Sequence, residues 1–109
     1  MAAERINRHN MTRCAEDRAT YQATIERDGG RCLECSAQGD HVHEIVGRAH
    51  FGKKKRAELF WLGNRCVLCW RCHNPMVHMK AGRTRLLGRL SKLYHYDYDS
   101  NPIFRAYLY

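Results

Sequence analysis

Two C-x-x-C pairs constrain this chain more than any other feature of its sequence. Cys32 and Cys35 form the first pair, and Cys69 and Cys72 form the second, in a chain of 109 residues. A domain of this length builds only a modest hydrophobic core and commonly depends on disulfides or on a structural metal. Two such pairs at this separation suit one tetrahedral zinc site with four thiolate ligands. The sequence therefore predicts a domain held together by Zn²⁺.

The start of the chain bears on the choice between zinc and disulfides. Its first ten residues, MAAERINRHN, are polar and charged and contain no apolar segment typical of a secretory leader. No apolar run approaches the length of a membrane span. We therefore expect an intracellular protein, in the cytoplasm of a bacterium or of a phage-infected host, where reducing conditions favour metal binding. Cys14 and Cys66 are expected to be small buried side chains and not ligands.

The charge of the chain indicates a polyanionic partner. Its 19 lysines and arginines oppose 11 acidic residues, which gives a formal net charge of +8. A basic surface on so small a protein favours nucleic acid through long-range attraction. We expect DNA as the partner. RNA is the next alternative, and an anionic membrane is the least favoured of the three.

Hydrophobic periodicity and turn residues predict the elements of the first two thirds of the chain. Thr12 is a candidate helix cap, and Gly29 and Gly30 are typical of a helix end. Pro75 is tolerated in a helix only in the first turn, so the last of these helices would begin near His73. The elements expected in chain order are a helix over 12–28, a strand over 41–46, a helical turn over 57–61, a strand over 65–68 and a helix over about 70–80.

The C-terminal part predicts an amphipathic helix. Gly82 interrupts the preceding pattern, and five apolar residues then recur at helical spacing opposite a basic face. We prefer a solvated basic face slightly over a dedicated DNA-contact face. The tail ends in Tyr107 and Tyr109, which could stack on bases or pack against the domain. The apolar residues are Leu86, Leu87, Leu90, Leu93 and Tyr94, and the basic ones are Arg83, Arg85, Arg89 and Lys92.

The segments around the cysteine pairs read CLEC, then HVHEIVGRAHFG, then GNRCVLCWRCHNPMVH. This order of motifs resembles the HNH (ββα-metal) nuclease family, in particular small phage and intron-associated members with an H-E-I core and an N-x-x-x-L-C-x-x-C-H ending. The resemblance covers about residues 30–78, and its second half, from Asn64 to His73, is the more specific. It implies a small α+β fold in one domain. A ββα-metal core over about 30–80 would hold the zinc site, flanked by the N-terminal helix and by a C-terminal helix and tail over about 83–109.

The same resemblance implies a metal-dependent endonuclease that hydrolyses phosphodiester bonds in DNA. It makes His43 the general base and His73 a ligand of the catalytic ion. It makes Asn64 the residue that holds the loop between the strands and orients the base. The catalytic ion would be Mg²⁺ or Mn²⁺ acting as a Lewis acid, and imidazole ligands also accept other divalent ions.

The general base is open between two histidines, of which His43 is preferred. Side chains alternate along a strand, so His41 and His43 share one face. In the other register His41 is the base and Asp40 is a metal ligand. Around His43, either Glu44 or His41 would complete the site. His78 is either a second ligand of the catalytic ion or an ordinary histidine, because a spacing of five residues aligns less well than four on a helix.

A basic run occupies the loop between the two strands, beside the expected cleavage site. Phosphate contact is the preferred interpretation, since such contacts give affinity and position without reading sequence. The alternative functions are a zinc-ribbon-like nucleic-acid-binding module without chemistry and a nuclease subunit of a phage packaging or homing assembly. The oligomeric state is open, and a homodimer is compatible with the sequence. The residues of this basic loop are Arg48, Lys53, Lys54, Lys55 and Arg56.

Overall fold

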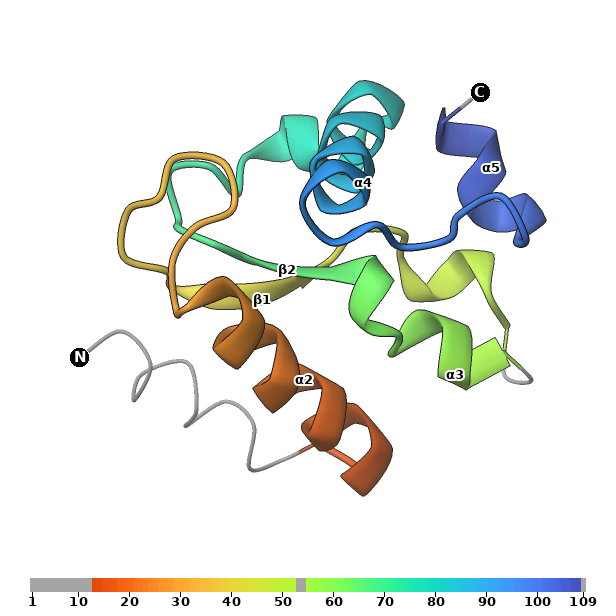
Figure 1. Ribbon diagram of the computed structural model, residues 1–109, viewed down its shortest axis with the longest axis horizontal. Helices are drawn as coiled ribbons and strands as arrows, with labels where there is room; N and C mark the ends of the chain where they lie inside the picture. The colour runs from red at the N-terminus through yellow and green to blue at the C-terminus, as the bar shows by residue number, and fades with distance from the viewer. Residues whose placement is uncertain (1–12, 53–54, 109) are drawn as a thin grey trace.

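The structure is a computed structural model that describes residues 13–52 and 55–108. Its centre is a two-stranded antiparallel hairpin of β1 (His41–Glu44) and β2 (Arg65–Leu68). Helix α2 (Ala15–Asp28) covers one side of the hairpin, while α4 (Lys80–Tyr94) and α5 (Pro102–Leu108) lie on the other (Figure 1). This is the small α+β class expected from the sequence. The shorter elements are η2 (Arg48–His50), α3 (Arg56–Leu59), η4 (Leu62–Asn64) and η5 (Pro75–His78).

The register of the hairpin assigns its two faces. Val67 of β2 packs against Tyr21 and Ile25 of α2 in a small apolar cluster. Its neighbours along β2 belong to the main core, which also contains the buried leucines of α4. His41 and His43 pair with Leu68 and Cys66, so both histidines lie on the face turned away from α2.

The first cysteine loop lies tightly against β2. Gly29 ends α2 in the left-handed conformation, with φ 65°, as its position in the sequence predicts. A Cβ atom at Gly39 would lie 2.1 Å from Cγ1 of Val67 and 2.8 Å from the carbonyl oxygen of Gly30. Only glycine therefore allows the chain to pass this close to the strand.

A buried ion pair connects α2 to the hairpin. Arg65 of β2 is fully buried, and its guanidinium contacts the carboxylate of Asp17 at 2.5 Å. It also donates to the backbone oxygen of Asp17 at 3.1 Å and lies 3.7 Å from Glu44 on the neighbouring strand. Because a buried charge is tolerated only when it is paired and hydrogen-bonded, these contacts fix α2 to β2.

The prediction of a helix over residues 70–80 is wrong. The chain after Cys72 forms a turn and the short helix η5, and α4 begins only at Lys80. Pro75 has no N–H to donate and disfavours the helical conformation of Asn74 before it. Gly82, expected to interrupt the pattern, lies buried inside α4. Burial of the leucines of α4 outweighs the cost of about 1 kcal/mol for a glycine in a helix.

For some side chains, the burial predicted from the sequence differs from the burial in the structure. Cys66 is fully buried as predicted, but Cys14 is exposed at the N-cap of α2. The expected cap Thr12 lies outside the described residues. Leu93 and Tyr94 were expected in the buried stripe of α4, yet they are 54% and 37% exposed.

The first strand and the tail also differ from expectation. Strand β1 ends at Glu44 and not at residue 46, although the next two residues are buried. The tail forms α5, an element that its composition does not predict. Tyr107 of α5 packs against the main core, so the structure favours packing over base stacking for this side chain. Tyr109 lies outside the described residues.

Candidate functional site

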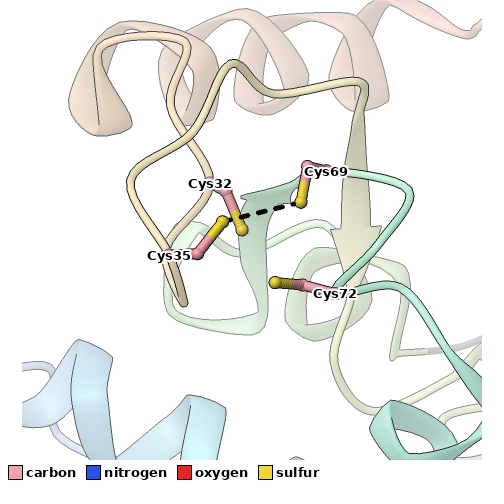
Figure 2. A group of neighbouring side chains, drawn as sticks. All are labelled: Cys32, Cys35, Cys69 and Cys72. Atoms are coloured by element: carbon pink, nitrogen blue, oxygen red, sulfur yellow. Dashed lines mark hydrogen bonds between the residues drawn. The ribbon is translucent and has the colours of Figure 1, made fainter.

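Four thiols converge between the two cysteine loops. Cys32 and Cys35 come from the loop after α2, and Cys69 and Cys72 from the loop after β2 (Figure 2). Their sulfur atoms all lie within 4.8 Å of one another, and those of Cys35 and Cys69 are 3.6 Å apart. Zinc with Zn–S bonds of about 2.3 Å separates its sulfurs by about 3.8 Å. All six cysteines are free, and the arrangement is consistent with a structural Zn²⁺ site.

Hydrogen bonds within each loop hold the thiols in place. The backbone N–H of Ser36 donates to the carbonyl of Cys32 at 2.9 Å. In the second loop, the N–H groups of Cys72 and His73 donate to the carbonyl of Cys69 at 3.2 Å and 3.0 Å. The same turn that orients two thiols therefore also orients the histidine that follows them.

The thiols differ in how readily they ionise. Burial tends to raise the pKa of Cys69, but hydrogen bonds from the backbone of Cys72 and from the thiol of Cys35 lower it to about 7. Burial raises the pKa of Cys72, and its hydrogen bonds with neighbouring thiols raise it further. Since zinc binds thiolates, Cys69 is the thiol best prepared to bind first.

Four histidines, here called the histidine cluster, meet beside the loop of Cys69 and Cys72, which we call the zinc loop. They are His41, His43, His73 and His78. The ring centroids of His43, His73 and His78 are 5.0 Å, 5.4 Å and 5.3 Å apart in pairs. His41 lies 4.2 Å from His73 and stacks on the indole of Trp70 at 4.7 Å. The cluster lines an open cavity of about 310 Å³, together with Glu44 and Arg83. The face of β1, the zinc loop and η5 thus contribute to one site.

His43 is the most enclosed member of the histidine cluster. It is 5% exposed, and its Nε2 atom is buried without a hydrogen-bond partner among the described residues. Burial lowers the pKa of His43 to about 3, with further lowering by the nearby His73 and His78. Burial also lowers the pKa of His73. His43 is therefore neutral near pH 7 and retains a lone pair for a proton or a cation.

Asn64 closes the long connection between the strands. It is fully buried, and its side-chain oxygen accepts the N–H of Val46 at 2.8 Å. Its side-chain nitrogen donates to the carbonyls of Val46 and Leu59, each at 3.0 Å. The end of β1 and the end of α3 are thereby connected to the residue before β2.

The two acidic residues considered for the site, Asp40 and Glu44, differ in whether they line the cavity. The carboxylate of Asp40 accepts the backbone N–H of Trp70 at 2.9 Å, and Asp40 does not line the cavity. Glu44 does line it, but its carboxylate also lies 3.7 Å from the buried Arg65. His78 joins the cluster because η5 turns the chain back, so helical spacing was the wrong criterion for this residue.

The basic loop is only partly described. Arg48 and Lys55 are exposed, and Arg48 follows Gly47, which lines the cavity. Lys53 and Lys54 lie outside the described residues, as does the side chain of Arg56. Two further residues at the site were not singled out from the sequence, Trp70 and Arg83. Trp70 carries no signal beyond its position in the zinc loop, and Arg83 resembles the other arginines of its helix.

No family model, curated protein or solved structure matches this chain. Among the described helices, none combines the length and the apolar character needed to cross a lipid bilayer.

Proposed function

We propose that this chain is a metal-dependent HNH-type endonuclease that hydrolyses phosphodiester bonds in DNA. The observation that supports this most is the convergence of His43, His73 and His78 on one open cavity. They come from three separate elements, and none of them is needed by a four-thiol zinc site. A module that only binds nucleic acid has no use for three imidazoles so close together.

The imidazoles of His73 and His78 are suitable donors for a divalent cation beside His43. Rings that share one ion at Zn–N or similar bonds of about 2.0–2.1 Å have centroids about 5 Å apart, and the centroids of His73 and His78 are 5.3 Å apart. Among the described residues, the four thiols are the one group of three or more ligand atoms that all lie within 4.8 Å of one another, so the nitrogens of His43, His73 and His78 are not that close together. The imidazoles of His73 and His78 would turn toward the cation when it binds. A bound Mg²⁺ or Mn²⁺ would supply Lewis-acid stabilisation of phosphate charge.

The remaining catalytic roles are assigned to individual residues of the site. His43, neutral and enclosed, would accept the proton of the attacking water. The negative charge of the scissile phosphate would raise the pKa of His43 from its low value in the free protein. His73 and His78 would hold the cation, and Asn64 would keep the end of β1 in place.

Burial favours His43 over His41 as the base. His43 is 5% exposed and lines the cavity, whereas His41 is only half-buried and is packed between Trp70 and His73. We therefore assign His41 to the rim of the site, where it would support His73.

DNA is the substrate that the charges favour. The chain has a net charge of +8, and the exposed Arg48 and Lys55 lie in the connection that borders the cavity. We assign Zn²⁺ to the four thiols, where it would be structural and take no part in the chemistry.

The test is cleavage of supercoiled plasmid by full-length, zinc-loaded protein. We expect nicked product with added Mn²⁺ or Mg²⁺ and none when the added ion is omitted or chelated. His43→Ala should abolish cleavage while zinc content and the thermal transition remain. His95→Asn is the matched control, because His95 is exposed at the end of α4 with φ 60°, a conformation that asparagine tolerates.

Two results would change the account. If folded, zinc-loaded protein cuts no form of DNA with any divalent ion, the binding module replaces the nuclease. If His43→Ala remains active and His41→Ala does not, the base is His41.

A further inference from the structure

Arg83 reaches from the start of α4 into the cavity that the histidine cluster lines. It is half-buried, whereas Arg85 and Arg89 of the same helix are exposed. Its Nε atom is enclosed and has no hydrogen-bond partner among the described residues. This guanidinium, which lines the cavity, therefore has one donor that no other described residue uses.

Helix α5 holds the other side of the guanidinium. Nη1 of Arg83 donates to the hydroxyl of Tyr107 at 3.0 Å and lies 3.3 Å from Nε2 of His50. The guanidinium carbon lies 5.6 Å from the centroid of the Tyr107 ring. The hydroxyl of Thr84 also donates to the backbone carbonyl of Tyr107 at 2.5 Å. Two consecutive residues of α4 are thus hydrogen-bonded to the same tyrosine.

Among the described residues, no acid balances the charge of Arg83. Within the described parts of the chain, no carboxylate lies within ion-pair distance of Arg83, while Arg85 pairs with Glu34 at 3.3 Å. The acid that lines the cavity, Glu44, lies 3.7 Å from Arg65. A half-buried guanidinium without a carboxylate partner among the described residues gains a favourable charge pair when an anion enters. The cavity therefore has the charge and the free donors to bind an oxyanion.

We propose that Arg83 is a further catalytic residue of this site, which binds a non-bridging oxygen of the scissile phosphate, and that Tyr107 is its positioning residue. The inference rests on the proposed nuclease function, for which it names the group that contacts the phosphate. A guanidinium presents parallel N–H donors that match phosphate oxygens, and its contact strengthens as charge develops in the transition state. Tyr107 accepts from Nη1, which leaves Nε–H without an acceptor among the described residues.

The first experiment measures single-turnover cleavage of plasmid at saturating full-length protein. Arg83→Gln should lower the rate by about 100- to 1,000-fold, the usual loss when one donor to a developing oxyanion is removed. Arg83→Lys should recover only part of this, since lysine keeps the charge but not the paired donors. Arg89→Gln, on the exposed side of α4, is the matched control and should cleave as the unmodified protein does.

Tyr107 is tested with a double-mutant cycle. Tyr107→Phe keeps the ring and removes the hydroxyl, and it should slow cleavage by about 10-fold, because one hydrogen bond of about 1.4 kcal/mol is lost. In the Arg83→Gln background the same change should have no further effect, since the residue that it positions is absent. Equal slowing in both backgrounds would assign Tyr107 a merely structural role and overturn its part of the proposal.

The second experiment separates this inference from the nuclease itself. Zinc-loaded protein without a catalytic ion is titrated with inorganic phosphate, and the NMR signal of the Arg83 Nε–H is followed. A phosphate-dependent shift that Arg83→Gln abolishes supports the anion site, even if no DNA is cut. If plasmid is cut, Arg83→Gln cleaves within twofold of the unmodified protein and phosphate leaves the Nε–H signal unchanged, the inference fails while the nuclease stands.

Discussion

The backbone N–H of His73 donates to the carbonyl oxygen of Cys69 at 3.0 Å. Cys72 donates to the same carbonyl at 3.2 Å, so one turn fixes two thiols of the metal site and one imidazole of the histidine cluster. The ring of His73 is then 5.0 Å from that of His43 across the cavity. The four-thiol site therefore supports the candidate active site directly as well as stabilising the fold.

Loss of one thiol should remove both the zinc and the fold. In Cys69→Ser we expect no stoichiometric zinc and no cooperative thermal transition. The free energy of zinc binding in small zinc domains is about 10–16 kcal/mol. This is at least comparable to the usual free energy of unfolding of a domain, about 5–15 kcal/mol. The exposed Cys14 offers the matched control. Cys14→Ser should bind one zinc per chain and unfold at the unmodified temperature or slightly above it, because serine is a favourable N-cap residue, as measured by elemental analysis and circular dichroism. A folded Cys69→Ser protein without metal would show that the thiol site is dispensable.

Asn64→Ala should destabilise the domain by about 2–4 kcal/mol, because it leaves buried backbone groups of Val46 and Leu59 without partners. Chemical denaturation measures this change in the free energy of unfolding. The exposed Gln38 also carries a side-chain amide and provides the control, and Gln38→Ala should fall within about 0.5 kcal/mol of the unmodified protein. Equal effects of the two substitutions would mean that Asn64 does not hold the connection between the strands.

Asp17→Ala should cost about 3–5 kcal/mol, since it leaves the fully buried Arg65 without its closest carboxylate. Glu16 precedes it on the exposed side of α2, so Glu16→Ala is the natural comparison and should change stability little. The same denaturation experiment applies. A loss below about 1 kcal/mol in Asp17→Ala would indicate that the pair does not connect α2 to the hairpin.

The low pKa of His43 makes stability depend on pH. Burial, followed by the neighbouring histidines, lowers this pKa to about 3. A histidine in an unfolded chain has a pKa of about 6.5. Below that pH, His43 binds a proton in the unfolded chain but not in the folded one. The free energy of unfolding should therefore fall as the pH decreases from about 6.5 toward about 3. One proton contributes up to about 1.4 kcal/mol per pH unit.

The comparison of two variants isolates this contribution. His43→Asn should lose less stability than the unmodified protein between about pH 7 and about pH 5, while His95→Asn should keep the original slope. Protonation of the zinc thiolates affects all three proteins alike and cancels in the comparison. Parallel curves for His43→Asn and the unmodified protein would contradict a buried neutral His43.

Local sequence signals predicted the parts of the fold that short-range chemistry decides. Gly29 ends α2, and β2 spans residues 65–68 as expected, because a left-handed glycine and a short apolar run are readable without tertiary information. The spacing of the cysteine pairs predicted their convergence. Alternation along β1 predicted that His41 and His43 share a face.

Tertiary packing decided the rest. The segment after Cys72 was expected to be helical, and Pro75 together with the buried Val77 instead gives the short η5. That difference moves His78 from an unfavourable helical spacing into the histidine cluster. Arg83 looks like any other arginine of a basic helix face, and only the packing of α5 against α4 shows that it points into the cavity. No periodicity in the sequence encodes such a contact.

The central claim is that His73 and His78 hold a cation beside His43, at a site separate from the four thiols. Titration of zinc-loaded, full-length protein with Mn²⁺ tests it most directly, with paramagnetic broadening of the imidazole NMR signals as the readout. We predict that one Mn²⁺ binds per chain and broadens the rings of these three histidines first, and that His73→Ala weakens this binding while Cys14→Ser does not. Folded protein with zinc in place whose three rings stay sharp at saturating Mn²⁺ would contradict the claim.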